Sequence, residues 1–328
     1  MNKIFITGAT GFIGSNLARK LANEGVLVHA LVRKNSAIST IRHKNIKLFY
    51  GNLLDIKSLD TAINGCSQVY HLAAYAKNYA RDNNLFNKIN VEGTENVLVM
   101  AKKHSVTKII YTSTSLVFGP SNKIESNESH LNNNNPYNDY DRSKMLAEEV
   151  IHNFILLGMK IITVYPTRVF GPGPLNESNA VTKMIVDYLR GKWRLKLSDG
   201  NAIGNYVYVN DLVDGLIAAM KYGNKGSKYV LGGANISYNK FFETVSEITG
   251  KRRFMLGVPA KIALMYSKIE EELANRFNRY PLITPGWIKV FLDDWAFSSS
   301  KAVLEINYKI TPLKSALNST IDWINHNI

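Results

Sequence analysis

Apolar and polar positions alternate along the first half of the chain in a pattern of strands and helices. Short runs rich in β-branched and aromatic residues are typical of buried strands, and longer stretches with apolar residues three and four apart are typical of helices. The predicted strands are Lys3–Thr7, Val26–Arg33, Ile46–Tyr50, Gln68–Ala73, Thr107–Ser113 and Lys160–Tyr165. The predicted helices are Phe12–Asn23, Asn84–Lys103 and Tyr140–Leu157. This order predicts an α/β fold with a doubly wound parallel sheet.

Three glycines follow the first predicted strand. The run TGATGFIG places Gly8, Gly11 and Gly14 in the turn and at the start of the first helix. A dinucleotide pyrophosphate needs a tight turn, a closely approaching backbone and free N–H groups at a helix N-terminus. The alternative is a glycine-rich turn that only caps a helix, but its place in the first strand–turn–helix unit favours a Rossmann-type dinucleotide site.

The strand and helix alternation ends after Pro166, where Pro and Gly cluster in residues 166–174. We expect residues 1–166 to form the Rossmann domain, and 206–231 to return to it with a strand at Lys228–Leu231. A smaller mixed C-terminal substrate lobe is expected from 167–205 and 232–328. The Asn-rich residues 132–135 are predicted to lie in a surface loop.

The end of the second predicted strand indicates which cofactor binds. An Asp or Glu there would bind the ribose 2′-hydroxyl of NAD and repel a 2′-phosphate, whereas this chain has Arg33 and Lys34. Because a guanidinium binds phosphate well, we expect NADP(H) to be preferred, with NAD(H) as a second cofactor. The alternative is that both side chains are solvated charges at an exposed strand end.

Tyr140 and Lys144 are four residues apart in a predicted helix, so their side chains share one face. A nearby ammonium favours the phenolate and is expected to lower the pKa of Tyr140, which would suit it to proton transfer. Tyr188 and Lys192 have the same spacing. They follow the sixth strand and are expected to lie away from the carboxyl ends of the strands, so we interpret that second pair as coincidental.

The chain resembles the extended short-chain dehydrogenases/reductases nearly from end to end. The resemblance lies in the following motifs: TGATGFIG at 7–14, GNLLD at 51–55, HLAA at 71–74, INVEGTENVL around Asn90, YTSTSLVFG at 111–119, YDRSK at 140–144, PTRVFGPG at 166–173 and YVYVNDL at 206–212. The family implies an NAD(P)-dependent enzyme and a homodimer formed through the two long helices.

The resemblance also implies roles for individual residues. Tyr140 would be the general acid and base, Lys144 would tune it and hold the cofactor ribose, and Thr114 would polarise the substrate oxygen. Thr114 lies five residues before Gly119, which distinguishes it from the neighbouring Ser113 and Ser115. The positions expected to bind cofactor are Gly8, Thr10, Gly11, Phe12, Ile13, Gly14, Arg33, Lys34, Asn52, Leu53, Leu72, Ala73, Ala74, Asn90, Tyr140, Lys144, Pro166 and Val169. No metal site is expected.

Three polar residues in or near these motifs need separate interpretation, and for Asp55 and His71 it is a structural one. Asn52 stands where the family has an acidic residue against the adenine amine, and keeps an acceptor oxygen without the charge. Asp55 is predicted to be a helix N-cap. His71 lies in a predicted strand and is expected to be a packed histidine and not a catalytic one.

Departures from the family motifs indicate the branch. Dehydratases of the family carry an Asp-Glu pair after the catalytic Thr, where this chain has Ser115 and Leu116. Many nucleotide-sugar enzymes carry a diphosphate-binding Arg before the YVYV strand, where this chain has Ile203, Gly204 and Asn205. The pattern is closer to dihydroflavonol-reductase-like and 3β-hydroxysteroid-dehydrogenase-like proteins. We therefore expect reversible reduction of a small apolar carbonyl compound.

Two other functions remain open. A nucleotide-sugar epimerase or dehydratase is the first alternative, because other basic residues could replace the missing Arg; the candidates are Arg168, Lys183, Arg190, Lys192 and Arg194. A non-catalytic cofactor sensor or nucleic-acid binder is a remote alternative, since sensors typically lose the Tyr and Lys that this chain retains.

The stretch from Phe254 to Ile269 is predicted to be an amphipathic helix containing Lys261 and Lys268. Its apolar residues at helical spacing, and those just beyond, are Ile262, Met265, Tyr266, Ile269, Leu273 and Phe277. We expect most of them to pack on the core of the C-terminal lobe. The alternative is that one edge of this helix lines an apolar substrate pocket.

Composition adds little to these expectations. The net charge is +14, but the basic residues are scattered in short pairs, so no nucleic-acid partner is expected. Cys66 is the single cysteine, which excludes an internal disulfide and favours the reducing cytoplasm. No uncharged apolar run approaches the roughly 18 residues of a membrane span.

Overall fold

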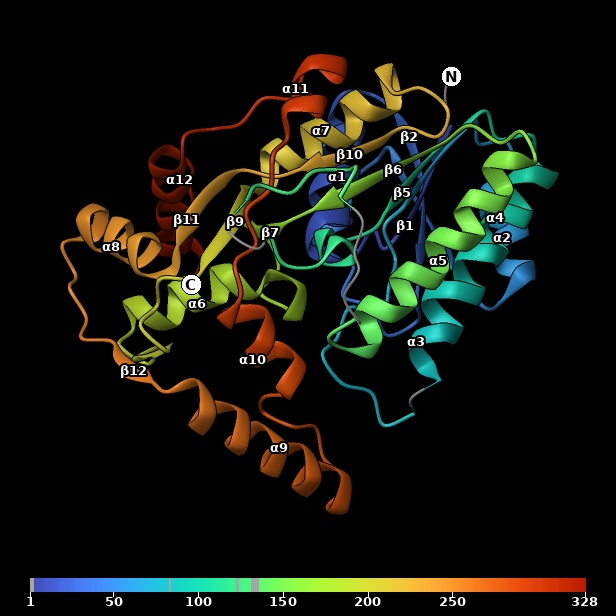
Figure 1. Cartoon of the computed structure of the whole chain (residues 1–328). Helices are drawn as coiled ribbons and strands as arrows, with labels where there is room; N and C mark the ends of the chain where they lie inside the picture. The colour runs from blue at the N-terminus through green and yellow to red at the C-terminus, as the bar shows by residue number, and fades with distance from the viewer. Residues whose placement is uncertain (1–2, 83, 122–123, 131–135) are drawn as a thin grey trace.

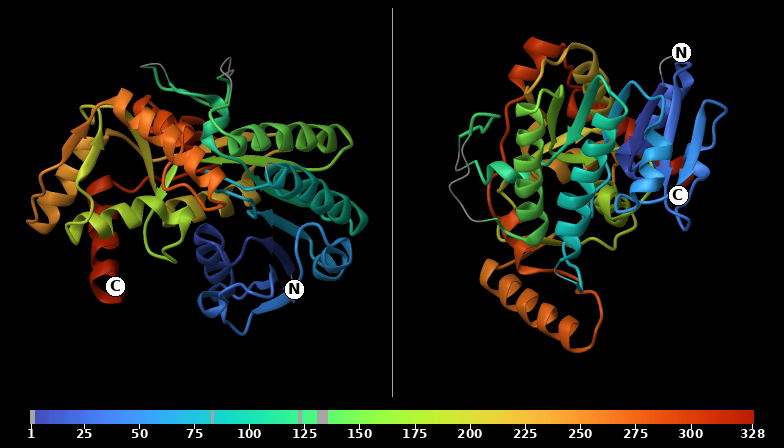
Figure 2. Two further views of the ribbon diagram at one scale, coloured as in Figure 1. Left: turned by 90° about the horizontal axis from the view of Figure 1, so that it is seen from below. Right: turned by 90° about the vertical axis from the view of Figure 1, so that its right-hand side faces the viewer.

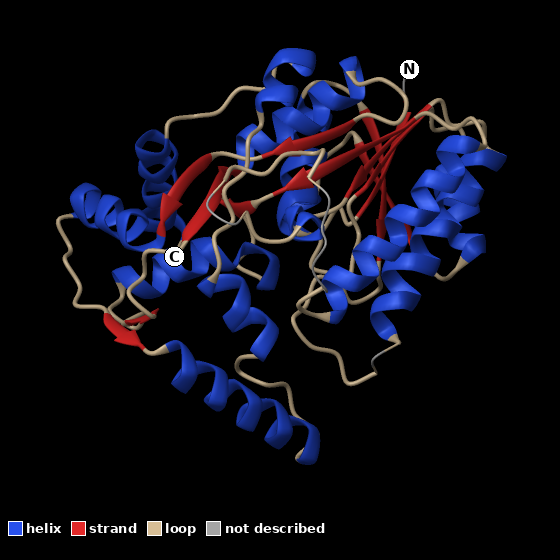
Figure 3. Cartoon of the chain, viewed as in Figure 1, coloured by secondary structure: helices blue, strands red, loops and turns tan. Residues whose placement is uncertain are grey.

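Figure 1 shows the computed structural model of the chain, which describes residues 3–82, 84–121, 124–130 and 136–328. The surface loop predicted at 132–135 lies outside these residues. The fold combines a large parallel sheet with a C-terminal lobe that contributes smaller sheets and helices (Figures 1 and 3). The predicted α/β class is therefore confirmed.

Seven of the described strands form one parallel sheet, in the order β10-β6-β5-β4-β1-β2-β3. These strands are β1 (Lys3–Thr7), β2 (Leu27–Val32), β3 (Ile46–Tyr50), β4 (Gln68–His71), β5 (Lys108–Thr112), β6 (Ile161–Pro166) and β10 (Lys228–Leu231). Each strand expected from the sequence overlaps one of them. The strand order reverses between β1 and β4, and that reversal creates the crevice where Rossmann folds bind dinucleotides.

Helices cover both faces of this sheet (Figure 3). One face is covered by α1 (Phe12–Asn23), α7 (Val209–Tyr222) and α11 (Ser300–Ile306). The other is covered by α2 (Ile56–Ile63), α4 (Gly93–Lys103) and α5 (Asp139–Leu156). Each face has its own apolar core, because both sides of a parallel sheet are buried.

The helix predicted over Asn84–Lys103 is present and runs without a gap from Leu85 to Lys103, with a π-helical turn inside it. It consists of α3 (Leu85–Asn87), a π-helical turn (Lys88–Glu92) and α4. The Thr94 hydroxyl, in the first turn of α4, donates back to the Asn90 carbonyl oxygen of the π-helical turn at 2.6 Å. The Asn90 side chain is hydrogen-bonded to Tyr75 and Ser143. π-helical turns of this kind often occur at functional sites.

The C-terminal lobe is built around two small sheets and several helices. One sheet contains β7 (Arg168–Phe170), β9 (Ile203–Tyr208) and β11 (Ala234–Ser237), and the other contains β8 (Leu195–Leu197) and β12 (Leu256–Val258). The helices are α6 (Ala180–Leu189), α8 (Tyr238–Thr249), α9 (Ala260–Arg276), α10 (Pro285–Leu292) and α12 (Leu313–Asn327). In the part of the chain that the structure describes, short 3₁₀ turns lie at Ser39–Ile41, Ser115–Phe118 and Glu177–Asn179.

Segment 206–231 divides between the two parts of the molecule. Its strand β10 pairs in parallel with β6 at the edge of the large sheet, and α7 packs against α1. The end of β9 pairs instead with β7 and β11 in the lobe. The division of the chain into two domains thus remains an expectation, with β9 on the lobe side.

Helix α9 differs from its expected packing. The apolar side chains predicted to contact the core of the lobe are exposed, by between 38% for Leu273 and 67% for Phe277. The side that faces the protein carries Ala263, Ser267 and Ala274, whose small side chains let the helix approach closely. The prediction of core packing was therefore wrong.

Among the described residues, no helix is long and apolar enough to cross a bilayer.

Candidate active site

The glycine-rich turn after β1 has the geometry of a pyrophosphate cradle. Gly8 has a φ of +75°, a conformation that favours glycine. A Cβ on Gly14 would lie 2.1 Å from the Gly8 carbonyl oxygen, so only glycine lets the helix begin this close to the strand. Gly11 is the N-cap of α1, and no side chain caps the helix. The first N–H groups of α1 are therefore available to an anion.

A cleft of about 840 Å³ lies over this turn, at the carboxyl ends of the strands. It brings together most of the residues predicted from the sequence. Those lining it are Gly8, Thr10, Gly11, Phe12, Ile13, Gly14, Arg33, Asn52, Leu53, Leu72, Ala73, Ala74, Thr114, Tyr140, Pro166 and Val169. These residues and the glycine cradle fit a dinucleotide.

Three predicted residues do not line the cleft. Lys34 is exposed at the end of β2. The Asn90 amide is buried, where it accepts from the Tyr75 backbone N–H at 2.7 Å and donates to the Ser143 hydroxyl at 2.8 Å. Asn90 therefore holds the segment after β4 against α5, and its expected contact with cofactor is not supported. The sequence motif could not show that its amide is already engaged.

Lys144 is the third of these residues. Its side chain is 2% exposed, and its Nζ donates to the Thr112 carbonyl oxygen at 2.8 Å. The ammonium also lies 4.3 Å from the centre of the Tyr111 ring. Lys144 is thus held beneath the wall of the cleft, and its ammonium has two further N–H donors besides the one bound to Thr112.

Tyr140 and Thr114 both lie in the wall of the cleft, and Thr114 is close enough to lower the pKa of Tyr140. Tyr140 lies in the first turn of α5, which begins after the Asn138 side chain accepts from the Asp141 N–H. Thr114 directly precedes a 3₁₀ turn after β5. The neighbouring Ser113 instead donates to Glu148 at 2.6 Å. Ser113 and Thr114 both line the cleft, and the catalytic role of Thr114 stays a prediction.

The expected lowering of the pKa of Tyr140 is wrong for the chain by itself. Burial raises the pKa of Tyr140, and the neighbouring Asp141 raises it further, whereas the Thr114 hydrogen bond lowers it. Burial also lowers the pKa of Lys144 to about 7, opposed by Glu148. Desolvation thus outweighs the charge effect that the spacing suggested, and Tyr140 holds its proton near neutral pH.

The cleft extends beyond the predicted residues toward the C-terminal lobe. The additional lining includes Leu31, Ser36, Gly51, Tyr75, Ala76, Lys77, Ile89, Thr112, Ser113, Thr167, Leu175, Asn176, Glu177, Ser178 and Lys183. Lys77, which follows β4, forms an ion pair of 3.2 Å with Glu177 of the lobe. Residues this far apart in sequence carry no local signal that would pair them.

Of the basic residues that could replace a diphosphate-binding Arg, Lys183 is the one that lines this cleft. Arg168 is already engaged, because it donates to the Val290 carbonyl oxygen at 3.0 Å and lies 4.6 Å from the Phe291 ring. Arg190 donates to the carbonyl oxygen of Ile328, outside the cleft. Lys192 and Arg194 are exposed and do not line it.

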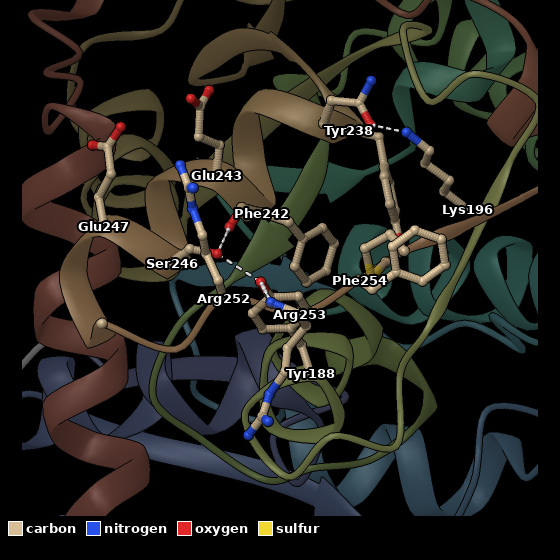
Figure 4. A pocket seen from close by; sticks show the side chains of 13 residues that line it. Tyr188, Lys196, Tyr238, Phe242, Glu243, Ser246, Glu247, Arg252, Arg253 and Phe254 are labelled. Carbon is tan, nitrogen blue, oxygen red and sulfur yellow. Dashed lines mark hydrogen bonds between the residues drawn. The ribbon is translucent and has the colours of Figure 1, made fainter.

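A second cavity of about 760 Å³ lies within the C-terminal lobe (Figure 4). Tyr188 contributes to it, and its hydroxyl is 2.6 Å from that of Ser246. Arg252 and Glu243 also line it. Lys192 does not line this cavity and follows the end of α6, so Tyr188 and Lys192 do not form a helical pair.

The two simpler interpretations of polar residues are confirmed. The Asp55 carboxylate accepts from the Ser58 N–H and caps α2. His71 is buried between the hydroxyls of Thr7 and Thr94, at 2.7 and 2.9 Å, and burial lowers its pKa to about 3. Asn52 lines the cleft, but its side-chain oxygen already accepts from the Leu54 N–H at 2.8 Å.

Known proteins share this fold and sequence pattern. Residues 4–232 match the model of the NAD dependent epimerase/dehydratase family. A Synechocystis protein with the provisional name dihydroflavonol 4-reductase is 28% identical over 98% of this chain and 94% of its own. A Mycobacterium tuberculosis 3 beta-hydroxysteroid dehydrogenase/Delta 5-->4-isomerase is 24% identical over 94% of this chain and 86% of its own.

A solved structure has the same fold over its whole length. The UDP-glucose 4-epimerase of Thermotoga maritima superposes with a TM-score of 0.83 at 23% identity, covering 99% of each chain. At that identity the likeness shows the fold alone. The family match covers most of the chain and includes the glycine turn and the Tyr140 helix. The chain therefore belongs to the NAD dependent epimerase/dehydratase family, within the extended short-chain dehydrogenases/reductases.

Proposed function

We propose that this protein is an NADP(H)-dependent oxidoreductase that reversibly reduces an apolar carbonyl compound. The observation that carries the proposal is that Thr114 and Tyr140 lie together in the wall of the cleft over the glycine turn. It puts a hydroxyl pair where a substrate carbonyl oxygen could accept from both.

The chemistry follows from the protonation state of the pair. When bound, the nicotinamide would supply hydride for the carbonyl carbon. Tyr140 gives the proton to the oxygen, and its raised pKa means that the proton is present near neutral pH. Thr114 orients the oxygen. Lys144, held below on the Thr112 carbonyl oxygen, is proposed to favour the phenolate that forms and to bind the cofactor ribose.

Arg33 supports the choice of NADP(H). It lines the cleft at the end of β2 and is exposed, so its guanidinium is accessible to a 2′-phosphate. Ser36 also lines the cleft and adds a hydroxyl donor. A charge-assisted contact of this kind is worth about 1.5–3 kcal/mol, or about tenfold or more in affinity.

The proposed substrate class rests on what the cleft offers. A sugar nucleotide brings a diphosphate, and burying it without a cationic partner is costly. Arg168 is engaged by Val290 and Phe291, while Tyr75 and Leu175 give apolar surface at the lobe end of the cleft. A nucleotide-sugar epimerase is the second candidate, and the observation that favours it is the position of Lys183 in the cleft lining.

A substrate panel tests the proposal. Purified protein is mixed with NADPH and either bulky apolar ketones and aldehydes or UDP- and dTDP-sugars. We expect NADPH oxidation with the carbonyl compounds and no sugar conversion. Epimerisation of a UDP-sugar, with every apolar carbonyl inert, would refute the proposal and support the second candidate. In that event Lys183→Ala should weaken sugar-nucleotide binding.

A further inference from the structure

Helix α9 presents a continuous apolar stripe to solvent. Its members recur every three or four residues and are Ile262, Met265, Tyr266, Ile269, Leu273 and Phe277, each between 38% and 67% exposed. Successive side chains of a helix are about 100° apart, so these six share one face. A stripe of large apolar side chains on the outer side of a helix marks an interaction surface.

The orientation of α9 is fixed by the protein. Ala263, Ser267 and Ala274 face inward and pack closely. The buried Glu270 carboxylate accepts two hydrogen bonds from Arg279, at 2.5 and 2.8 Å, and a third from the Leu282 N–H at 2.9 Å. These contacts lock the end of the helix, so it cannot turn its apolar face inward without breaking them.

The surroundings of the stripe are basic. Within α9, Lys261, Lys268 and Arg276 stand against Glu271 and Glu272, and Glu270 is paired with Arg279. Lys261 and Lys268 each directly precede a stripe residue, so both lie along the same edge of it. An apolar face bordered by cations complements an anionic lipid surface, where acyl chains lie below negatively charged headgroups.

The position of α9 connects this surface to the cleft. The helix projects from the C-terminal lobe at the edge of the molecule (Figures 1 and 2). At its end, Asn275 accepts from the Tyr79 hydroxyl at 2.5 Å, and the Tyr280 ring contacts Tyr79, Lys77 and Arg81. Lys77 lines the cleft, together with Tyr75 and Ala76. The mouth of the cleft is therefore beside the end of α9.

We propose that α9 lies on an anionic bilayer with its apolar stripe in the interface, and that apolar substrates reach the cleft from the lipid. The delivery of substrates from the lipid rests on the proposed function. A second copy of the chain fits less well. The helix has 17 residues and is about 25 Å long, and a stripe of that length buries far less than the roughly 800 Å² per partner of a stable interface.

Vesicle flotation with the full-length protein tests the docking, without substrate or cofactor. We expect the protein to float with phosphatidylcholine vesicles that contain phosphatidylglycerol, and to bind less to phosphatidylcholine alone or in high salt. Ile269→Ser/Leu273→Ser should reduce partitioning by about tenfold or more, because two aliphatic side chains leave the interface. Lys261→Glu/Lys268→Glu should also reduce it, by about tenfold or more.

Matched controls carry the same changes elsewhere. Leu304 on α11 is 82% exposed, and Leu304→Ser should leave flotation unchanged. Lys225→Glu alters an exposed lysine outside the α9 region and should have little effect. Circular dichroism checks that each variant is folded. Equal flotation of wild type and the α9 variants, or no binding to anionic vesicles, would overturn the docking.

Two further readouts separate this proposal from its alternatives. If α9 covered a second copy, Ile269→Ser/Leu273→Ser would lower the sedimenting mass without lipid, and wild type would not float; that result would overturn the proposal. For delivery, the same variant should lose turnover of a vesicle-held ketone about tenfold, in proportion to its lost binding, and keep turnover of a water-soluble ketone. If the variant kept wild-type turnover of the vesicle-held ketone as well as of the water-soluble one, delivery from the lipid would be refuted. If no carbonyl is reduced at all, the proposed function fails while the flotation result stands.

Discussion

Asp141 offers a stability test that follows directly from the structure. Its side chain is 2% exposed, and its Oδ1 has no hydrogen-bond partner among the residues described. Burial raises the pKa of this carboxyl from the ordinary value of 3.8 to about 7, although a Tyr137 backbone contact and Asn138 oppose the rise. Asp141→Asn removes the charge and keeps the shape.

The sign of the effect follows from proton linkage. Below pH 3.8 the carboxyl is protonated in both the folded and the unfolded chain, so it contributes no pH dependence. Between that pH and about 7 the folded state holds a proton that the unfolded state has lost, so wild-type stability falls as the pH rises. Above about pH 7 the carboxyl is ionised in both the folded and the unfolded chain, and the buried charge destabilises the folded state by its full amount.

The magnitude comes from the same difference in pKa. Each pKa unit corresponds to about 1.4 kcal/mol, so Asp141→Asn should stabilise the protein by up to about 4 kcal/mol at pH 8. For a chain of this length that is about 5 °C in Tm. At pH 4 the two proteins should have nearly equal stability.

Thermal and urea unfolding across pH 4–8 measure this difference. Asp139→Asn is the matched control in the same helical turn, where the side chain is 46% exposed and pairs with Arg142. It should change stability by only a few tenths of a kcal/mol, because such surface pairs contribute little. If Asp141→Asn destabilised the protein equally at every pH, the buried charge would not be the dominant property of this residue.

Three more predictions follow from the cleft. Tyr140→Phe should lower turnover about 10²-fold or more while cofactor titration shows unchanged binding, with Tyr188→Phe as a nearly silent control; the reverse result would mean that the wrong tyrosine was chosen. Lys144→Met should weaken both turnover and cofactor binding, and loss of only one would limit Lys144 to a single role. Gly14→Ala should lower cofactor affinity about tenfold or more by calorimetry, because its Cβ would lie 2.1 Å from the Gly8 carbonyl oxygen.

The sequence predicted the Rossmann core because its signals are local. Each strand of the first half overlaps its expected range, and Gly8 and Gly14 stand in the turn that needs them. The spacing between Thr114 and Gly119 reflects the turn after β5 that these two residues bound, while the choice of Thr114 over Ser113 stays a prediction.

Other features depended on contacts that no local pattern contains. Periodicity identified α9 as amphipathic, but the helix packs on the protein through the small Ala263 and Ser267, so its large apolar side chains face solvent. The spacing of Tyr140 and Lys144 suggested a lowered tyrosine pKa, and the degree of burial reversed the direction. Asn90 matched its motif, yet its amide was already bonded across the fold.

Hydride transfer itself is the most direct test of the central claim. Protein, NADPH deuterated at the transferred position and an apolar ketone are incubated, and the alcohol is analysed by mass spectrometry. We predict one deuterium in the alcohol and NADPH consumed in equal amount, with far less product for Tyr140→Phe. Absence of deuterated alcohol from every ketone, with a UDP-sugar epimerised and no net NADPH consumed, would contradict the account.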